Sequence, residues 1–360
     1  MAAPEKSLGS FVTEKKVGMG EDAPPISRNY KDLGDVVAVF DGMGGSGATQ
    51  VPVDSTITAM AEGKCSMAYI ASRVVSRTVE QVLGQLGSSN LPKLKSQVEA
   101  AVKAELVKLA ERPDGKGPEP RLRGTILAEY PTTVAIAVVR PSADEFNRRQ
   151  VNVYWAGDSR IYALIPDPDQ TIPLQLLTRD HSDFGEGGDA PLERYACTKG
   201  LDLEESEYSL PPSSAVIAMS DGCFAYMSPF RLLFLLIQEI RFARNIDEWI
   251  DAIKTKISSI AGDDCSFAIS LGEGGFDALR ERVADVYSEL EPLMYVPQDI
   301  KPNRYVLTHQ ESMFEELFDE TRNRRLKAST PPLLPPTLAS DETPVFLEVK
   351  PKDTDLKPEV

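Results

Sequence analysis

Acidic residues stand at the ends of several apolar segments of this chain. They are Asp41 after residues 36–40, Asp158 after residues 151–155, Asp221 after residues 215–219, and the pair Asp263-Asp264 before residues 267–269. The ends of strands are where a rigid scaffold presents side chains to a site. Carboxylates gathered without cations would repel one another, so a cluster of them indicates bound cations. Oxygen ligands on irregular backbone suit Mg²⁺ or Mn²⁺, and two histidines offer little for a zinc site.

The glycines that follow Asp41 allow two interpretations. Gly42, Gly44 and Gly47 match the dinucleotide-binding pattern G-x-G-x-x-G after a strand. Alternatively, Asp41 is a metal ligand and the glycines let the backbone approach the ion. The dinucleotide interpretation would leave the Asp41 charge unpaired beside a pyrophosphate, and no second strand–helix–strand unit follows. We therefore favour the metal ligand, although an Asp-Gly pair by itself is often only a turn.

The composition excludes several classes of partner. The 360 residues carry a formal net charge of −16 and the sequence pI is about 4.7, which argues against a nucleic-acid or anionic-membrane surface. No apolar run reaches membrane-spanning length. The four cysteines show no C-x-x-C spacing, which indicates neither a zinc site nor a disulfide framework and favours the reducing cytoplasm. Cys223 and Cys265 are expected to pack as small apolar residues.

The apolar periodicity predicts helices grouped in pairs among strands. Helices are expected over residues 60–86, 93–110, 229–240 and 246–260, and strands over 36–40, 132–139, 151–155, 161–164, 174–177, 215–219 and 267–269. Ser228 with Pro229 and Asn245 with Glu248 are typical helix starts. No element is predicted in residues 1–35, or in the polar segment that ends near residue 212. This order indicates an α+β fold.

Three regions are expected along the chain. Residues 7–272 form the main domain, and residues 273–328 form a C-terminal extension with helices over 276–290 and around 313–318. Residues 329–360 are rich in proline and are expected to be disordered or extended. Residues 112–124 are expected to form a loop.

The motifs that surround these acids occur in an order that resembles a known family. Residues 36–45, Gly157-Asp158-Ser159-Arg160, Met219-Ser220-Asp221-Gly222 and Asp263-Asp264-Cys265-Ser266 are similar to the ordered motifs of the metal-dependent PPM (PP2C-type) serine/threonine phosphatases, in particular their bacterial branch. The resemblance implies a four-layer α-β-β-α sandwich with two central antiparallel sheets. It also implies a binuclear Mn²⁺ or Mg²⁺ site.

The resemblance assigns a role to each acid. Asp41 would bridge both ions, the Gly42 carbonyl would bind the second, and Asp221 and Asp263 would hold the first. Glu21 and Asp22 match the acidic pair of the first family motif, acting directly or through water. Asp158 aligns with an acid that contacts a third ion in some relatives. His181 is expected to be a buried structural residue.

The sequence departs from the family pattern at three positions. Lys15 and Lys16 stand near the place of an arginine that holds phosphate in eukaryotic members, so they are candidate phosphate-binding residues. Met43 replaces the eukaryotic histidine, as in bacterial relatives. Ala225 replaces an acid, which puts the third ion at Asp158 in doubt.

The resemblance implies hydrolysis of phosphoserine or phosphothreonine on proteins by a metal-activated water. Partners would be phosphorylated proteins, including a Ser/Thr kinase or its targets. The alternative is a catalytically weak or silent protein of the same fold that regulates by binding a partner. The presence of Asp41, Asp221 and Asp263 favours the enzyme.

Overall fold

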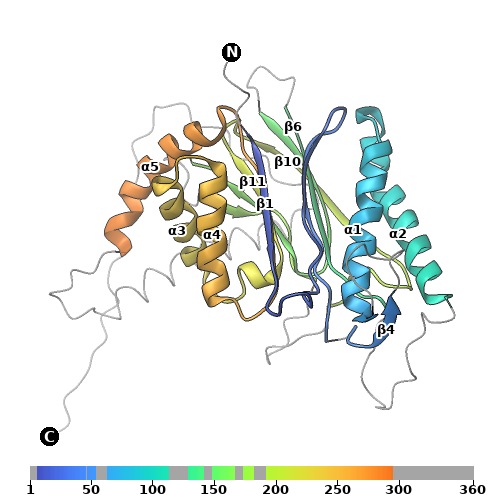
Figure 1. Cartoon of the computed structure of the whole chain (residues 1–360). Helices are drawn as coiled ribbons and strands as arrows, with labels where there is room; N and C mark the ends of the chain where they lie inside the picture. Colours follow the sequence, from blue (N-terminus) through green and yellow to red (C-terminus); the bar gives the residue numbers. More distant parts are fainter. Residues whose placement is uncertain are drawn as a thin grey trace, which may run out of the picture.

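The computed structural model describes residues 6–45, 47–53, 63–112, 129–141, 148–166, 173–181 and 192–294. Within these residues, two five-stranded antiparallel sheets form the centre of the molecule (Figure 1). The prediction of an α+β sandwich with two central antiparallel sheets is confirmed.

The first sheet has the strand order β1-β12-β11-β8-β9. Its strands are β1 (Leu8–Thr13), β8 (Arg160–Leu164), β9 (Leu174–Leu176), β11 (Ala215–Met219) and β12 (Cys265–Ser270). Among the described residues, the first strand thus pairs with the last, which brings residues near 15–22 beside those that precede β12.

The second sheet has the strand order β10-β7-β6-β3-β2. Its strands are β2 (Ile26–Tyr30), β3 (Gly34–Val39), β6 (Val134–Pro141), β7 (Arg149–Ala156) and β10 (Glu204–Leu210). A separate two-stranded sheet, β4 (Gln50–Val53) and β5 (Gly63–Ser66), precedes the first helix. Because β3 pairs antiparallel with both neighbours, the parallel unit that a dinucleotide site needs is not formed around it.

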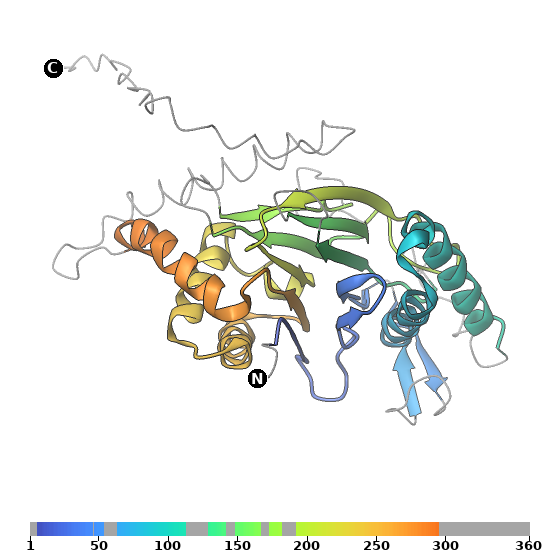
Figure 2. The same cartoon turned by 90° about the horizontal axis from the view of Figure 1, so that it is seen from above.

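Helices cover the outer face of each sheet (Figures 1 and 2). On the second sheet lie α1 (Met67–Gln85) and α2 (Leu94–Ala110), joined by the 3₁₀ turn η1 (Ser88–Lys93). On the first sheet lie α3 (Pro229–Phe242), α4 (Ile246–Ile260) and α5 (Gly275–Met294). A second 3₁₀ turn, η2 (Asp221–Cys223), follows β11.

Three hydrophobic cores hold these four layers together. Strand alternation sends Val37 and Val39 into the core between the sheets, whereas Val36 and Ala38 face α1 and α2. The third core lies between the first sheet and α3–α5, where Trp249 is fully buried. Strands covered on both faces read as continuous apolar runs, which is why these segments were predictable.

The predicted starts of α3 and α4 are confirmed. The Ser228 hydroxyl accepts a hydrogen bond from Arg231 N at 3.3 Å, and Asn245 Oδ1 accepts one from Glu248 N at 3.0 Å. In a capping box the Glu248 carboxylate would accept a hydrogen bond from Asn245 N. Here it accepts one from Arg244 N, at 3.0 Å, instead.

Five strands were missed: β1, β2, β4, β5 and β10. β1, β2 and β10 lie at sheet edges, and β2 and β10 carry exposed polar side chains, so their apolar content is low. Residues 63–66 form β5, although a helix was predicted from residue 60, so that prediction was wrong by several residues.

The described part of the C-terminal extension packs on the main domain. Phe276, Leu279 and Val283 of α5 belong to the core under α3 and α4, and Arg280 Nη1 donates to Ala243 O at 3.2 Å. The loop predicted over residues 112–124 lies, from residue 113 on, outside the described residues. The helix around 313–318 and the proline-rich region lie outside them entirely. No helix among the described residues has the length and apolar character needed to cross a membrane.

Candidate functional site

The acids at the strand ends line one cavity of about 360 Å³. Asp41 follows β3 and Asp158 follows β7 in the second sheet, whereas Asp221 follows β11 and Asp263 precedes β12 in the first. Antiparallel pairing places these ends at the same edge of the sandwich. The lining residues are Glu21, Asp41, Gly42, Met43, Gly44, Gly45, Thr133, Asp158, Leu192, Asp221, Asp263 and Asp264.

Asp41 is anchored through its backbone. Its carbonyl accepts hydrogen bonds from Thr133 N at 2.8 Å and from the Thr132 hydroxyl at 2.7 Å. Its own N–H donates to Thr133 Oγ1 at 3.1 Å. The strand end is therefore held in place through its backbone, and Asp41 lines the cavity.

Two glycines allow the backbone segments around the cavity to pack closely. A Cβ on Gly42 would lie 2.6 Å from Glu21 O and 2.8 Å from Ala68 O. A Cβ on Gly222 would overlap the carbonyl oxygen of Asp264. The glycine after each of these two aspartates thus serves backbone packing at the site.

The segment that carries Glu21 is tied to Asp264. The Asp264 carboxylate accepts from Lys15 N at 2.7 Å and from Glu21 N at 2.6 Å, and the Ser66 hydroxyl donates to the Glu21 carboxylate. Asp264 is a site residue to which the sequence analysis gave no role. Its place beside Asp263 was the available signal, but only the pairing of β1 with β12 shows what it holds.

Asp22 lies behind the cavity and does not line it. Its side chain is 2% exposed and accepts a hydrogen bond from Ser220 Oγ at 2.7 Å. Ser220 Oγ in turn accepts from Ser266 N at 2.8 Å. The structure therefore places Asp22 as a buried neighbour of the cavity acids, linked to β12 through Ser220.

Burial and mutual repulsion raise the pKa values of several of these carboxyls. Burial raises the pKa of Asp22 to about 7, and burial with the charges of Asp221 and Asp180 raises the pKa of Asp158 to about 7. Burial and the charges of Asp22, Asp221 and Asp158 raise the pKa of Asp41 well above its ordinary value. The pKa values of Asp221 and Glu21 are raised as well, chiefly by burial. The cluster is thus costly to ionise unless cations are present.

The donor set of the cavity fits a hard divalent cation. Its lining provides carboxylates and backbone oxygens, and it contains no histidine or cysteine among the described residues. Nevertheless, no group of three or more His, Cys, Asp or Glu side chains in the described part of the chain is arranged to hold an ion as it stands. The structure thus gathers the predicted ligands around one cavity without forming a finished coordination site.

The predicted phosphate-binding lysines do not line the cavity. Lys15 and Lys16 are exposed, and only the Lys15 backbone takes part in the site, through Asp264. An arginine to which the sequence analysis gave no role, Arg160, acts on the acids instead. Arg160 holds Asp180 with two hydrogen bonds, of 2.9 and 2.7 Å, and its charge lowers the pKa values of Asp158 and Asp221.

His181 and the two core cysteines lie where they were expected. His181 is buried, and its Nδ1 accepts a hydrogen bond from Gly157 N at 3.1 Å. Cys223 and Cys265 are buried in the core under α3 and α4, and all four cysteines are free thiols.

Gly222→Ala is expected to destabilise the fold, because the added Cβ overlaps Asp264 O and a well-packed backbone has to move. We expect a loss of about 1–3 kcal/mol in the free energy of unfolding, measured by urea denaturation. Gly45→Ala is the matched control, because nothing lies within 4 Å of its Cβ position. Equal stability of the two variants would contradict the close packing at Gly222.

Comparisons with known proteins identify the fold. No family model and no curated protein sequence matches the chain. Among solved structures, the serine/threonine phosphatase Stp1 from Staphylococcus aureus aligns with a TM-score of 0.51 at 16% identity, covering 74% of this chain and 95% of that one. A bacterial serine phosphatase aligns with a TM-score of 0.50 at 16% identity, covering 74% of this chain and 98% of that one. The chain has the fold of the bacterial PP2C-type Ser/Thr phosphatases.

Proposed function

We propose that this protein is a metal-dependent phosphatase that hydrolyses phosphoserine or phosphothreonine on proteins. One observation carries the proposal. In a fold shared with bacterial Ser/Thr phosphatases, carboxylates from separate strand ends of both sheets line a single cavity. Acids whose pKa values are raised by one another are a common feature of sites that bind cations or move protons.

The cavity acids would hold two Mn²⁺ or Mg²⁺ ions. Asp41 would contact both, the Gly42 carbonyl would contact the second, and Asp221 and Asp263 would hold the first. Glu21 would act directly or through water, and Asp158 is the candidate for a third ion. When bound, such ions activate water and neutralise phosphoryl oxygens.

The residues of the chain position these groups and supply no covalent nucleophile. Thr132 and Thr133 fix the backbone of Asp41, and Asp264 fixes the segment that carries Glu21. Among the described residues that line the cavity there is no serine, cysteine, histidine or lysine. Thr133 also lines the cavity, but its hydroxyl is hydrogen-bonded to Asp41 N and to Ser159 Oγ. Water would therefore be the nucleophile, and Asp22, hydrogen-bonded to Ser220, would hold a proton beside Asp41.

The substrate would reach the acids from the side of Asp263, which is the exposed member of the set. A phosphorylated side chain of a protein, including a Ser/Thr kinase or one of its targets, is the proposed ligand. Four unpaired thiols support a place in the reducing cytoplasm.

Hydrolysis of p-nitrophenyl phosphate tests the proposal. We expect turnover that requires Mn²⁺ or Mg²⁺, stops with a chelator, and falls by at least about 100-fold in Asp221→Asn, since one ligand of the first ion loses its charge. If no divalent ion supports turnover, the proposed phosphatase activity is wrong. Partner binding that persists in the chelated protein would then support the silent, regulatory alternative.

A further inference from the structure

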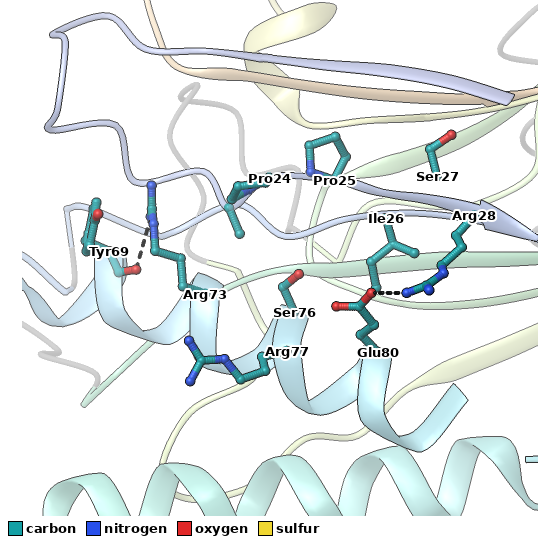
Figure 3. A pocket seen from close by; sticks show the side chains of 11 residues that line it. Pro24, Pro25, Ile26, Ser27, Arg28, Tyr69, Arg73, Ser76, Arg77 and Glu80 are labelled. Carbon is teal, nitrogen blue, oxygen red and sulfur yellow. Dashed lines mark hydrogen bonds and ion pairs between the residues drawn. The ribbon is translucent and has the colours of Figure 1, made fainter. Parts of the chain in front are cut away.

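A second cavity, of about 420 Å³, lies between the segment that forms β2 and the helix α1 (Figure 3). One wall comes from the segment before and within β2, and the other from a single face of α1. The residues that matter for its chemistry are Pro24, Ile26, Arg28, Arg73, Arg77 and Glu80. We call this cavity the α1–β2 groove. It combines an apolar wall with several charged groups.

The α1–β2 groove has an excess of positive charge. Three guanidinium groups line it with one carboxylate, and that carboxylate, Glu80, accepts from Arg28 Nη1 at 3.0 Å. Arg73 donates to the carbonyls of Gly20 at 3.0 Å and Tyr69 at 3.1 Å, and within the described residues it has no carboxylate partner at salt-bridge distance.

Arg77 is the groove cation with the fewest partners. Its side chain is exposed, and among the described residues it makes no hydrogen bond or ion pair. Figure 3 shows its guanidinium directed away from Glu80, whereas Arg28 turns toward Glu80. Its charge is therefore available to a ligand, in a chain whose formal net charge is −16.

The groove and the acidic cavity lie on two sides of one short segment. Glu21 lines the acidic cavity with its side chain, and its carbonyl accepts hydrogen bonds from the Ser72 hydroxyl at 2.5 Å and from Arg73 Nη1 at 3.5 Å. Ala23, two residues on, lines the groove. The segment 21–23 therefore contributes to the walls of both cavities.

We propose that the α1–β2 groove binds an acidic segment of the phosphoprotein substrate, a few residues from the phosphorylated side chain. The inference rests on the proposed phosphatase function. A strongly acidic protein repels negatively charged peptides at long range, and a local cationic groove reverses that field where the peptide must lie. The aliphatic parts of the peptide contact Pro24, which is exposed, and its carboxylates face Arg77.

Direct binding tests the groove without any turnover. The probe is a fluorescent, unphosphorylated peptide of Glu, Asp and Leu residues, measured by anisotropy with the full-length protein in chelator. Arg77→Glu is expected to weaken binding about fivefold or more, and added salt is expected to weaken it further. Glu80→Gln is expected to tighten binding because it frees Arg28. Arg282→Glu, an equal charge reversal on an exposed position of α5, is expected to change little.

Kinetics then connect the groove to catalysis. For a phosphopeptide with acidic flanks, Arg77→Glu is expected to lower kcat/KM about fivefold, with no change for its glutamine-flanked counterpart or for p-nitrophenyl phosphate. The proposal that the groove binds an acidic peptide is wrong if Arg77→Glu and Arg282→Glu have equal effects. It is also wrong if neither Arg77→Glu nor Glu80→Gln changes peptide binding. If peptide binding depends on Arg77 but no metal-dependent turnover is found, the groove does bind acidic peptides. The proposed phosphatase function is then wrong.

Discussion

Asp41→Asn is expected to abolish metal-dependent turnover and to stabilise the metal-free protein. Asp41 is the proposed ligand of both ions, so losing its charge weakens two sites at once. Metal ions contribute several kcal/mol to the transition state, so the loss in kcat is expected to be at least about 10³-fold. Initial rates with p-nitrophenyl phosphate across a Mn²⁺ titration give this number.

The gain in stability has a separate physical cause. Burial, together with the charges of Asp22, Asp221 and Asp158, disfavours the ionised carboxyl of Asp41, and a neutral amide of the same shape removes that cost. We expect an increase of about 1–2 kcal/mol, or a few °C in Tm, which grows as the pH rises and more of the acids ionise.

Asp251→Asn is the matched control for this prediction. Asp251 is exposed on α4, and the substitution changes the net charge by the same amount. It is expected to leave both turnover and Tm nearly unchanged. If Asp41→Asn kept its metal-dependent turnover, Asp41 would not be the bridging ligand. If Asp41→Asn lowered Tm in chelator, the cost of burying and crowding the carboxyl would be smaller than the hydrogen bonding lost with it.

The central strands and the site acids were predictable from sequence for the same reason. A strand buried on both faces is a continuous apolar run, so β3, β11 and β12 stand out, and an acid at the end of such a run is conspicuous. The family resemblance supplied roles for Asp41, Asp221 and Asp263. The structure adds that these acids line one cavity, which no local pattern establishes.

Features that depend on distant pairing could not be predicted. Asp264 holds the Glu21 segment because β1 pairs with β12, across some 250 residues of sequence separation. The α1–β2 groove combines Arg28 of an edge strand with Arg73 and Arg77 of a helix that had been interpreted only through its apolar face. In sequence, isolated arginines on a polar face look like any solvated helix surface. A charged groove formed where two distant elements pack together is therefore difficult to predict from the sequence.

The metal-free protein is expected to become less stable as the pH rises from about 5.5 to about 7.5. The pKa values of Asp22 and Asp158 are both raised to about 7, so over this range the folded state holds protons that the unfolded state has already lost. A carboxyl of this kind stabilises the fold fully below its unfolded pKa, and that contribution is lost as the pH rises through the folded pKa. Each retained proton lowers the free energy of unfolding by about 1.4 kcal/mol per pH unit.

The buried side chain of His181 has the opposite effect on how stability depends on pH. Burial lowers the pKa of His181, so its contribution is lost as the pH falls below the ordinary histidine pKa. It is a single group, whereas the pKa values of Asp41 and Asp221 are raised together with those of Asp22 and Asp158. The acids are therefore expected to determine the sign.

Urea denaturation at several pH values, with chelator and with Mn²⁺, measures this dependence. In chelator, Asp158→Asn is expected to reduce the slope of the unfolding free energy against pH by the equivalent of about one proton. Asp251→Asn is expected to leave that slope unchanged. Saturating Mn²⁺ is expected to stabilise the fold more at high pH than at low pH, because the ion binds ionised carboxylates and competes with protons. The chelated protein would then lose stability where the Mn²⁺-bound protein gains it. A metal-free protein whose stability rises with pH over this range would contradict the raised pKa values of the cavity acids, and with them the proposed cation site.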